Sequence, residues 1–213
     1  MSEQTNSTVK NGRFPVWVWP LLLIVVLAGG GFFWFSNARS QELAAIEAAR
    51  AAAAEGDWAE VQTAVSEAIA IQPAFALQYG NDALALRGIA HYHQGNFEEA
   101  LSDLTTVASD SPNLVEPIGY IADIYAQQGD ESAFLDNVDV ALAAEKELPQ
   151  DLAAKLRSHE ALFAEDADLA AAAIDSYAPF YSDLELARLY LLRGEQTESL
   201  ADQQTALLLG EGE

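Results

Sequence analysis

A glycine followed by a polar residue recurs along this chain at intervals close to the length of one helical hairpin. The pairs are Gly56-Asp57, Gly95-Asn96, Gly129-Asp130 and Gly194-Glu195. Glycine suits the residue after a helix end because it reaches left-handed backbone angles, and Asp or Asn suits the N-cap of the next helix. The glycines are roughly 34 residues apart, with one interval about twice that, and this period predicts a stack of helix–turn–helix units.

The composition between these turns also favours helices. Hydrophobic residues make up 51% of the chain. Ala dominates them, and runs of Val and Ile that alternate with polar residues are scarce. Residues 40–54 are rich in Ala and contain no Pro. The expected period is therefore that of helices and not of strands, and the sequence predicts an all-α protein.

The segment 81–113 carries the fullest version of the repeat. The spacing in this segment is that of the pattern W-x2-L-G-x2-Y, followed by A-x3-F and then P. The first-helix positions are Leu84, Gly88 and His91, the second-helix pair is Ala100 and Leu104, and the closing proline is Pro112. On these residues the chain resembles the tetratricopeptide repeat (TPR) family, with Arg87 in place of the usual Leu. The resemblance implies hairpins that each bury one face only when neighbours stack on it.

Four further units follow the pattern less fully. Residues 40–73 supply the first. The third loses the pattern where Phe134 occupies the Ala position and no Pro closes the hairpin, so its packing is expected to be locally unusual. A fourth spans residues 151–182, and the last closes with a helix over residues 200–209. Together they predict a TPR-like α-solenoid of about five helical hairpins over residues 40–210.

The resemblance also implies where a partner binds. In tetratricopeptide proteins the first helix of each unit lines a concave surface that binds peptides or helices. The matching positions here are Arg50, Asp82, Ile89, Tyr92, His93, Glu116, Asp123 and Gln127, and they are the predicted binding groove. An exposed Tyr among polar groups is typical of a binding hot spot, so Tyr92 is expected to contribute most. Some family members clamp a terminal carboxylate with Lys and Asn, which this groove lacks.

The N-terminal part of the chain has the features of a membrane segment. From Phe14 to Phe35 there is no charged residue, and as a helix this stretch is roughly 33 Å long, enough to cross a hydrocarbon core. Trp17 and Trp19 lie near one end and a run of aromatic residues lies at the other. Such aromatic belts are typical of the two lipid–water boundaries. The sequence predicts a tail over residues 1–13 and a single transmembrane helix over residues 14–35.

Charges beside this segment indicate its orientation. Lys10 and Arg13 precede it, which favours a cytoplasmic N-terminus and an extracytoplasmic, periplasmic repeat domain. The alternative is a cleaved signal peptide, because the small residues from Ser36 to Ala38 resemble a cleavage site. A secreted or periplasmic form would then begin near Arg39. The length of the apolar run and the bulky aromatics before the cut favour the uncleaved anchor.

Charge and motif content exclude several classes of function. The net charge is −23, the wrong sign for binding nucleic acid, which requires neutralisation of phosphates. There is no Cys, and His91 and His93 are too close in sequence to share a helix face as zinc ligands do. Phosphate-binding, dinucleotide-binding, hydrolase and metalloprotease motifs are absent from the sequence. We therefore expect no catalytic residues, no metal and no cofactor.

These features predict a scaffold and not an enzyme. The expected function is that of a membrane-tethered TPR adaptor for protein–protein interactions, an accessory subunit or assembly factor of a membrane protein complex. The alternative is a secreted or periplasmic peptide-binding TPR protein, released by cleavage of the N-terminal segment. The mature N-terminus distinguishes the two.

Overall fold

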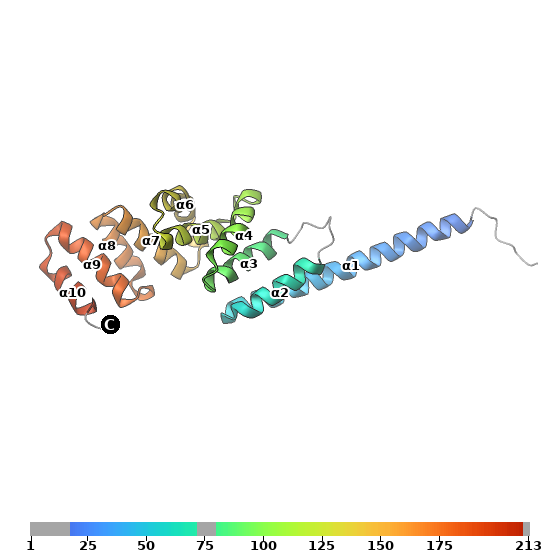
Figure 1. Cartoon of the computed structure of the whole chain (residues 1–213), viewed down its shortest axis with the longest axis horizontal. Coiled ribbons are helices and arrows are strands. Elements are labelled where there is room, and N and C mark those ends of the chain that lie inside the picture. The colour runs from blue at the N-terminus through green and yellow to red at the C-terminus, as the bar shows by residue number, and fades with distance from the viewer. Residues whose placement is uncertain (1–17, 72–79, 211–213) are drawn as a thin grey trace, which may run out of the picture.

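The computed structural model describes residues 18–71 and 80–210 (Figure 1). The predicted tail over residues 1–13 lies outside them. Within the described ranges the chain forms helices and no strand, so the predicted all-α class is confirmed. The elements are α1 (Val18–Glu55), α2 (Trp58–Ile71), α3 (Gly80–His93), α4 (Phe97–Asp110), α5 (Val115–Gln128), α6 (Glu131–Ala143), η1 (Glu145–Glu147), α7 (Gln150–Phe163), α8 (Ala167–Tyr177), η2 (Ala178–Phe180), α9 (Asp183–Thr197) and α10 (Leu200–Gly210).

The helices pair in chain order, and the pairs follow one another in a row. α1 packs against α2, α3 against α4, α5 against α6, α7 against α8 and α9 against α10. Each odd-numbered helix also contacts the next odd-numbered one, from α1 and α3 through to α7 and α9. Figure 1 shows the elongated array that results, with α10 at one end and the N-terminal half of α1 at the other. The odd-numbered helices therefore form a layer in which side chains from successive pairs meet.

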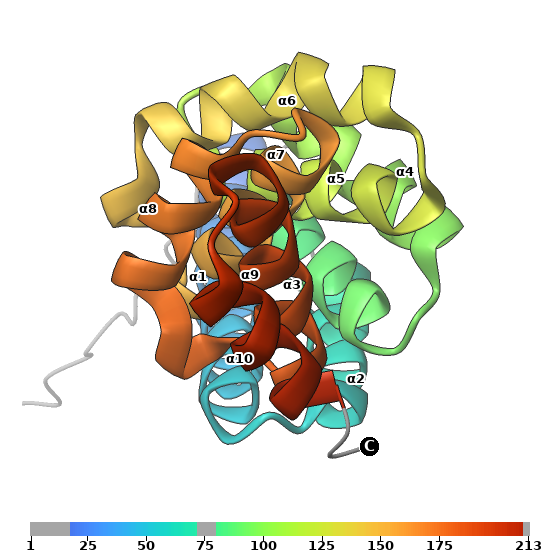
Figure 2. The ribbon, with the colours of Figure 1, turned by 90° about the vertical axis from the view of Figure 1, so that its left-hand side faces the viewer.

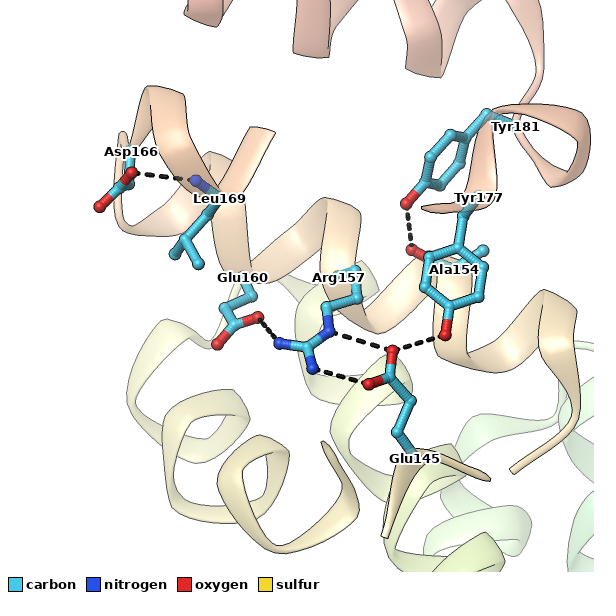
Figure 3. A network of polar contacts seen from close by, with 8 residues as sticks. All are labelled: Glu145, Ala154, Arg157, Glu160, Asp166, Leu169, Tyr177 and Tyr181. Carbon is cyan, nitrogen blue, oxygen red and sulfur yellow. Dashed lines mark hydrogen bonds and ion pairs between the residues drawn. The ribbon is translucent and has the colours of Figure 1, made fainter. Parts of the chain in front are cut away.

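Three of the predicted turns are confirmed. Their glycines have φ angles of 76°, 77° and 73°, at Gly56, Gly95 and Gly129. Residues other than glycine rarely adopt these left-handed backbone angles. The turn between α7 and α8 uses Glu165 instead, with φ of 48°, and Asp166 caps α8 by accepting a hydrogen bond from the backbone N–H of Leu169 at 3.0 Å (Figure 3).

The predicted turn at Gly194 is wrong. Gly194 is buried inside α9, which continues to Thr197, and the left-handed residue that follows the helix is Glu198, with φ of 55°. A Cβ on Gly194 would lie 3.0 Å from Cγ of Gln203 and 3.1 Å from Cβ of Asp202. The missing side chain lets α9 and α10 approach each other closely. This glycine therefore serves packing between helices and not the reversal of the chain.

Gly88 permits a similar approach between α3 and α4. A Cβ at this position would lie 2.7 Å from Cγ of Leu104, which is fully buried. Beside it, Arg87 donates hydrogen bonds to both carboxylate oxygens of Asp103, at 2.6 and 2.7 Å. Such bidentate pairs are among the stronger polar contacts in proteins. The departure from the family pattern at Arg87 thus has a structural reason, because the arginine links the two helices of the pair.

The connection from α6 to α7 runs through η1 and is held by side chains of α7 and α8. Phe134 of α6 is fully buried, and its ring centroid lies 5.2 Å from that of Phe163 on α7. Arg157 donates to both carboxylate oxygens of Glu145, at 3.1 and 2.8 Å, and Tyr177 donates to the same carboxylate (Figure 3). Phe134, at the usual Ala position, is therefore packed against the next helix pair through Phe163.

α1 continues without a break through the junction predicted between the membrane segment and the first repeat. The predicted membrane helix over residues 14–35 begins outside the described residues and extends into α1. Among the described residues, no helix is long and apolar enough to cross a membrane. Several large apolar side chains of this half of α1 are exposed, Leu23, Ile24, Phe32, Phe33 and Trp34.

Candidate binding pocket and the buried network beside it

A surface pocket lies where α1, α3 and the start of α5 meet, and we call it the α1–α3–α5 pocket. Its volume is about 260 Å³. Four of the predicted groove residues line it, Arg50, Asp82, Ile89 and Glu116. Its apolar lining consists of Ala85, Leu86, Ile89, Leu114, Val115 and Pro117. The structure thus brings half of the predicted groove together around an apolar surface.

Carboxylates dominate the charged part of this pocket. Arg50 is the one base among the described residues that line the pocket. It forms ion pairs with Asp82 at 2.9 Å and with Glu47 at 3.0 Å. Burial raises the pKa of Glu116, and the nearby charge of Asp151 raises it further. Glu147 also lines the pocket. With Arg50 already paired to acids, the pocket suits an apolar group that carries a positive charge at its edge.

The other four predicted groove residues lie further along the odd-numbered helices. Tyr92 and Asp123 are buried, with 6% and 0% of their surface exposed. Tyr92 donates a hydrogen bond of 2.5 Å to Oδ2 of Asp123, and the side-chain amide of Gln127 donates to the same oxygen at 2.7 Å. The prediction that Tyr92 and Asp123 face the groove is therefore corrected. Both face the packing between α3 and α5, where polar atoms need partners inside the protein.

Two side chains from α7 complete this buried network. Lys155 donates a hydrogen bond of 2.9 Å to the hydroxyl oxygen of Tyr92. Nε2 of His159 lies 3.4 Å from Oδ1 of Asp123. One carboxylate at the centre of α5 is thus linked to α3 through Tyr92 and to α7 through His159. The network joins three successive helix pairs across the odd-numbered layer.

The electrostatics of the network keep Asp123 ionised and Tyr92 protonated. Burial by itself raises the pKa of the Asp123 carboxyl, but hydrogen bonds from His159, Tyr92 and Gln127, together with the charge of Lys155, outweigh it and lower that pKa. Burial and the neighbouring charge of Asp123 raise the pKa of Tyr92. Both hydrogen bonds to Asp123 reach Oδ2, and among the described residues Oδ1 has only His159 nearby, at 3.4 Å. A buried charge held in this way links helices and is shielded from solvent.

His93 occupies the edge of the same region and is exposed. Its ring stacks on Trp58, with centroids 3.8 Å apart and planes 7° from parallel. Partial desolvation of the ring where it stacks on Trp58 lowers the pKa of His93, and the charge of Lys155 lowers it further. His93 and Gln127 are therefore the two members of this set that reach the surface. Gln127 takes part in the network through Asp123, His93 lies at its edge, and neither lines the α1–α3–α5 pocket.

No metal site is found in the described part of the chain, where no three residues among His, Cys, Asp and Glu are arranged to hold an ion.

The chain matches no family model, no curated protein and no solved structure.

Lys155 and His159 were not predicted, although both belong to the network. They lie four residues apart, so they share one face of α7, and this spacing is the only sequence signal that marks them. The apolar lining of the pocket was also missed apart from Ile89. Its members Leu114 and Pro117 lie at and after the connection from α4 to α5, where the repeat pattern makes no assignment.

Proposed function

We propose that this chain is a non-enzymatic scaffold of the tetratricopeptide type, tethered to a membrane through residues 14–35, that holds a protein partner against its odd-numbered helices. It serves as an accessory subunit or assembly factor of a membrane protein complex. The observation that carries the proposal is the α1–α3–α5 pocket, in which side chains from three odd-numbered helices surround an apolar surface. Four of its lining residues, Arg50, Asp82, Ile89 and Glu116, stand at positions that the family resemblance implies. The pairwise contacts of α1 to α10 support the likeness to a TPR solenoid.

The chemistry of the pocket indicates what it holds. Leu86 and Leu114 provide apolar contact, while Asp82, Glu116 and Glu147 surround it with carboxylates. Specific protein interfaces combine such an apolar centre with a polar rim. A partner segment with an aliphatic or aromatic side chain next to Lys or Arg fits this arrangement, and its binding is expected to weaken as salt is added.

Site-specific cross-linking tests this partner site. A photoreactive amino acid at Leu114, which lines the pocket and is 40% exposed, is expected to capture the partner in native membranes. The same residue at Leu135 of α6, which is 47% exposed, is the matched control and should capture little. In a chain without the photoreactive residue, Leu114→Lys should reduce co-purification of the partner identified in this way about tenfold, which corresponds to one lost apolar contact. Equal capture from both positions would show that the pocket is not the binding site.

The membrane tether is proposed from the uncharged stretch over residues 14–35 and from the exposed aromatics of α1. Phe32 and Phe33 are each 75% exposed and Trp34 is 58% exposed. In Figure 1 this half of α1 projects away from the other helices. Exposed apolar surface of this kind marks contact with lipid or with another protein. The proposal places the N-terminus in the cytoplasm and the repeat domain on the extracytoplasmic side.

Fractionation tests the tether. After an alkaline carbonate wash the full chain is expected to remain in the membrane pellet, because the apolar segment is held by lipid and not by charge. Intact-mass measurement should show the unprocessed N-terminus. A soluble protein that begins near Arg39 would instead support the secreted or periplasmic peptide-binding alternative.

A further inference from the structure

α10 differs from the other even-numbered helices in the number of helices that pack against it. α2, α4, α6 and α8 each pack against the odd-numbered helix before them and the one after them. In the described part of the chain, α10 packs extensively against α9 alone. Figure 2 shows α9 and α10 together at the C-terminal end of the array. The face of α10 turned away from α9 is thus left open by the described helices.

This open face is apolar and carries no charge. Leu200, Leu207 and Leu208 are 72%, 67% and 73% exposed, and Ala201 and Gln204 are exposed between them. The only charged residue of α10 is Asp202, which accepts two hydrogen bonds of 2.7 Å from Arg193 of α9. The chain as a whole has a net charge of −23, and this neutral leucine-rich face contrasts with that acidity.

We propose that the open face of α10 binds the same face of a second copy of this chain, with the two α10 helices antiparallel across a two-fold axis at Gln204. The exposed residues are arranged symmetrically about that position. Leu200 then lies opposite Leu208 of the partner subunit, and Leu207 lies opposite Ala201 of the partner subunit. The amide of Gln204 both donates and accepts hydrogen bonds, so it pairs with its own copy.

The symmetry and the missing charge of this face together make a second copy the occupant that fits it. Two copies of a strongly acidic chain repel each other over most of their surfaces, and like charges that meet in an interface disfavour binding. A two-fold interface uses the same patch on both subunits, so it must be self-complementary. α10 satisfies both conditions, because its open face is uncharged and its leucines meet small or apolar residues when the helix is reversed. In such a dimer α10 would pack against a second helix besides α9, as the other even-numbered helices each pack against two helices of the array.

Disulfide cross-linking tests this interface, since the chain contains no Cys. In the full chain in mild detergent, Gln204→Cys is expected to form a disulfide-linked dimer under mild oxidation, because the two thiols meet at the axis. Leu135→Cys, which introduces a comparably exposed thiol on α6, is the control and should give at least about tenfold less dimer at the same concentration, a difference typical of a specific contact. Equal yields from the two positions would overturn the proposal.

A charge exchange separates self-association from binding of a different protein. Two variants of the Gln204→Cys chain are compared. One carries Leu200→Lys and Leu208→Lys, and the other carries Leu200→Glu and Leu208→Glu. Each variant should fail to dimerise alone because like charges face each other. Mixing the two variants should restore the cross-linked product as a heterodimer. Thermal melting checks that both variants remain folded, as expected for exposed positions. Failure of the mixture to cross-link, with both variants folded, would overturn the proposed pairing.

Discussion

Asp123→Ala is expected to lower the free energy of unfolding by about 3 kcal/mol, the usual cost of removing one member of a buried charged network. The carboxylate is fully buried and accepts hydrogen bonds from Tyr92 and Gln127. Its loss leaves the Tyr92 hydroxyl without its acceptor and removes the buried negative charge that acts on Lys155. For a chain of this length the melting midpoint, measured by circular dichroism, should fall by roughly 8 °C.

Two comparisons isolate this effect. Asp139→Ala removes an exposed carboxylate of α6 and should leave melting nearly unchanged. Asp123→Asn keeps the shape but removes the charge, so it tests the pH dependence. Because the folded protein lowers the pKa of Asp123, the charge stabilises the fold above the unfolded pKa and this contribution is lost as the pH falls below about 4. The wild type should therefore lose more stability on acidification than Asp123→Asn, and identical acid profiles would contradict the role of the network.

Gly88→Leu is expected to destabilise the array by about 3 kcal/mol, at the upper end of what overpacking costs. Even a Cβ at this position would lie 2.7 Å from Cγ and 2.8 Å from Cδ2 of Leu104. Leu104 is fully buried, so its side chain can move away only by displacing other residues of the core. α3 and α4 must therefore separate, which also strains the ion pair between Arg87 and Asp103. Urea denaturation followed by circular dichroism measures the loss.

The control for this prediction is Glu99→Ala, an exposed substitution on α4 that should change stability by less than about 0.5 kcal/mol. A second variant tests the mechanism, because Leu104→Ala in the Gly88→Leu background removes the obstructing side chain. The double variant should be less destabilised than the sum of the two single variants. Additive losses would show that Gly88 does not act through Leu104.

The position of Tyr92 changes what a substitution there can reveal. From the sequence, Tyr92, Asp123 and Gln127 form an exposed patch whose replacement removes binding and leaves melting unchanged. In the structure the first two are buried and hold three helix pairs together, so their replacement disturbs the fold itself. Loss of binding in such variants would not identify a contact surface. Leu114, at the pocket and partly exposed, is the position that separates binding from stability.

The glycine turns show how far local sequence determines this protein. At Gly56, Gly95 and Gly129 the backbone needs left-handed angles that glycine reaches at little cost, so a local requirement of the chain is visible in the sequence. The same residue type at Gly194 meets a different requirement, the close approach of α10 to α9. Both requirements select glycine, and only the distance to a residue on the other helix tells them apart.

The all-α class and three of the turns follow from local sequence, because helix propensity and left-handed turn residues act over a few neighbouring positions. Tertiary structure decided which polar side chains are buried and which surround a pocket. Tyr92 and Asp123 contact Lys155 and His159 across more than one helix pair, and the pocket joins Arg50 to Leu114 and Glu147. Such meetings depend on the angle and spacing at which whole pairs stack, and these depend on packing contacts spread over many distant residues.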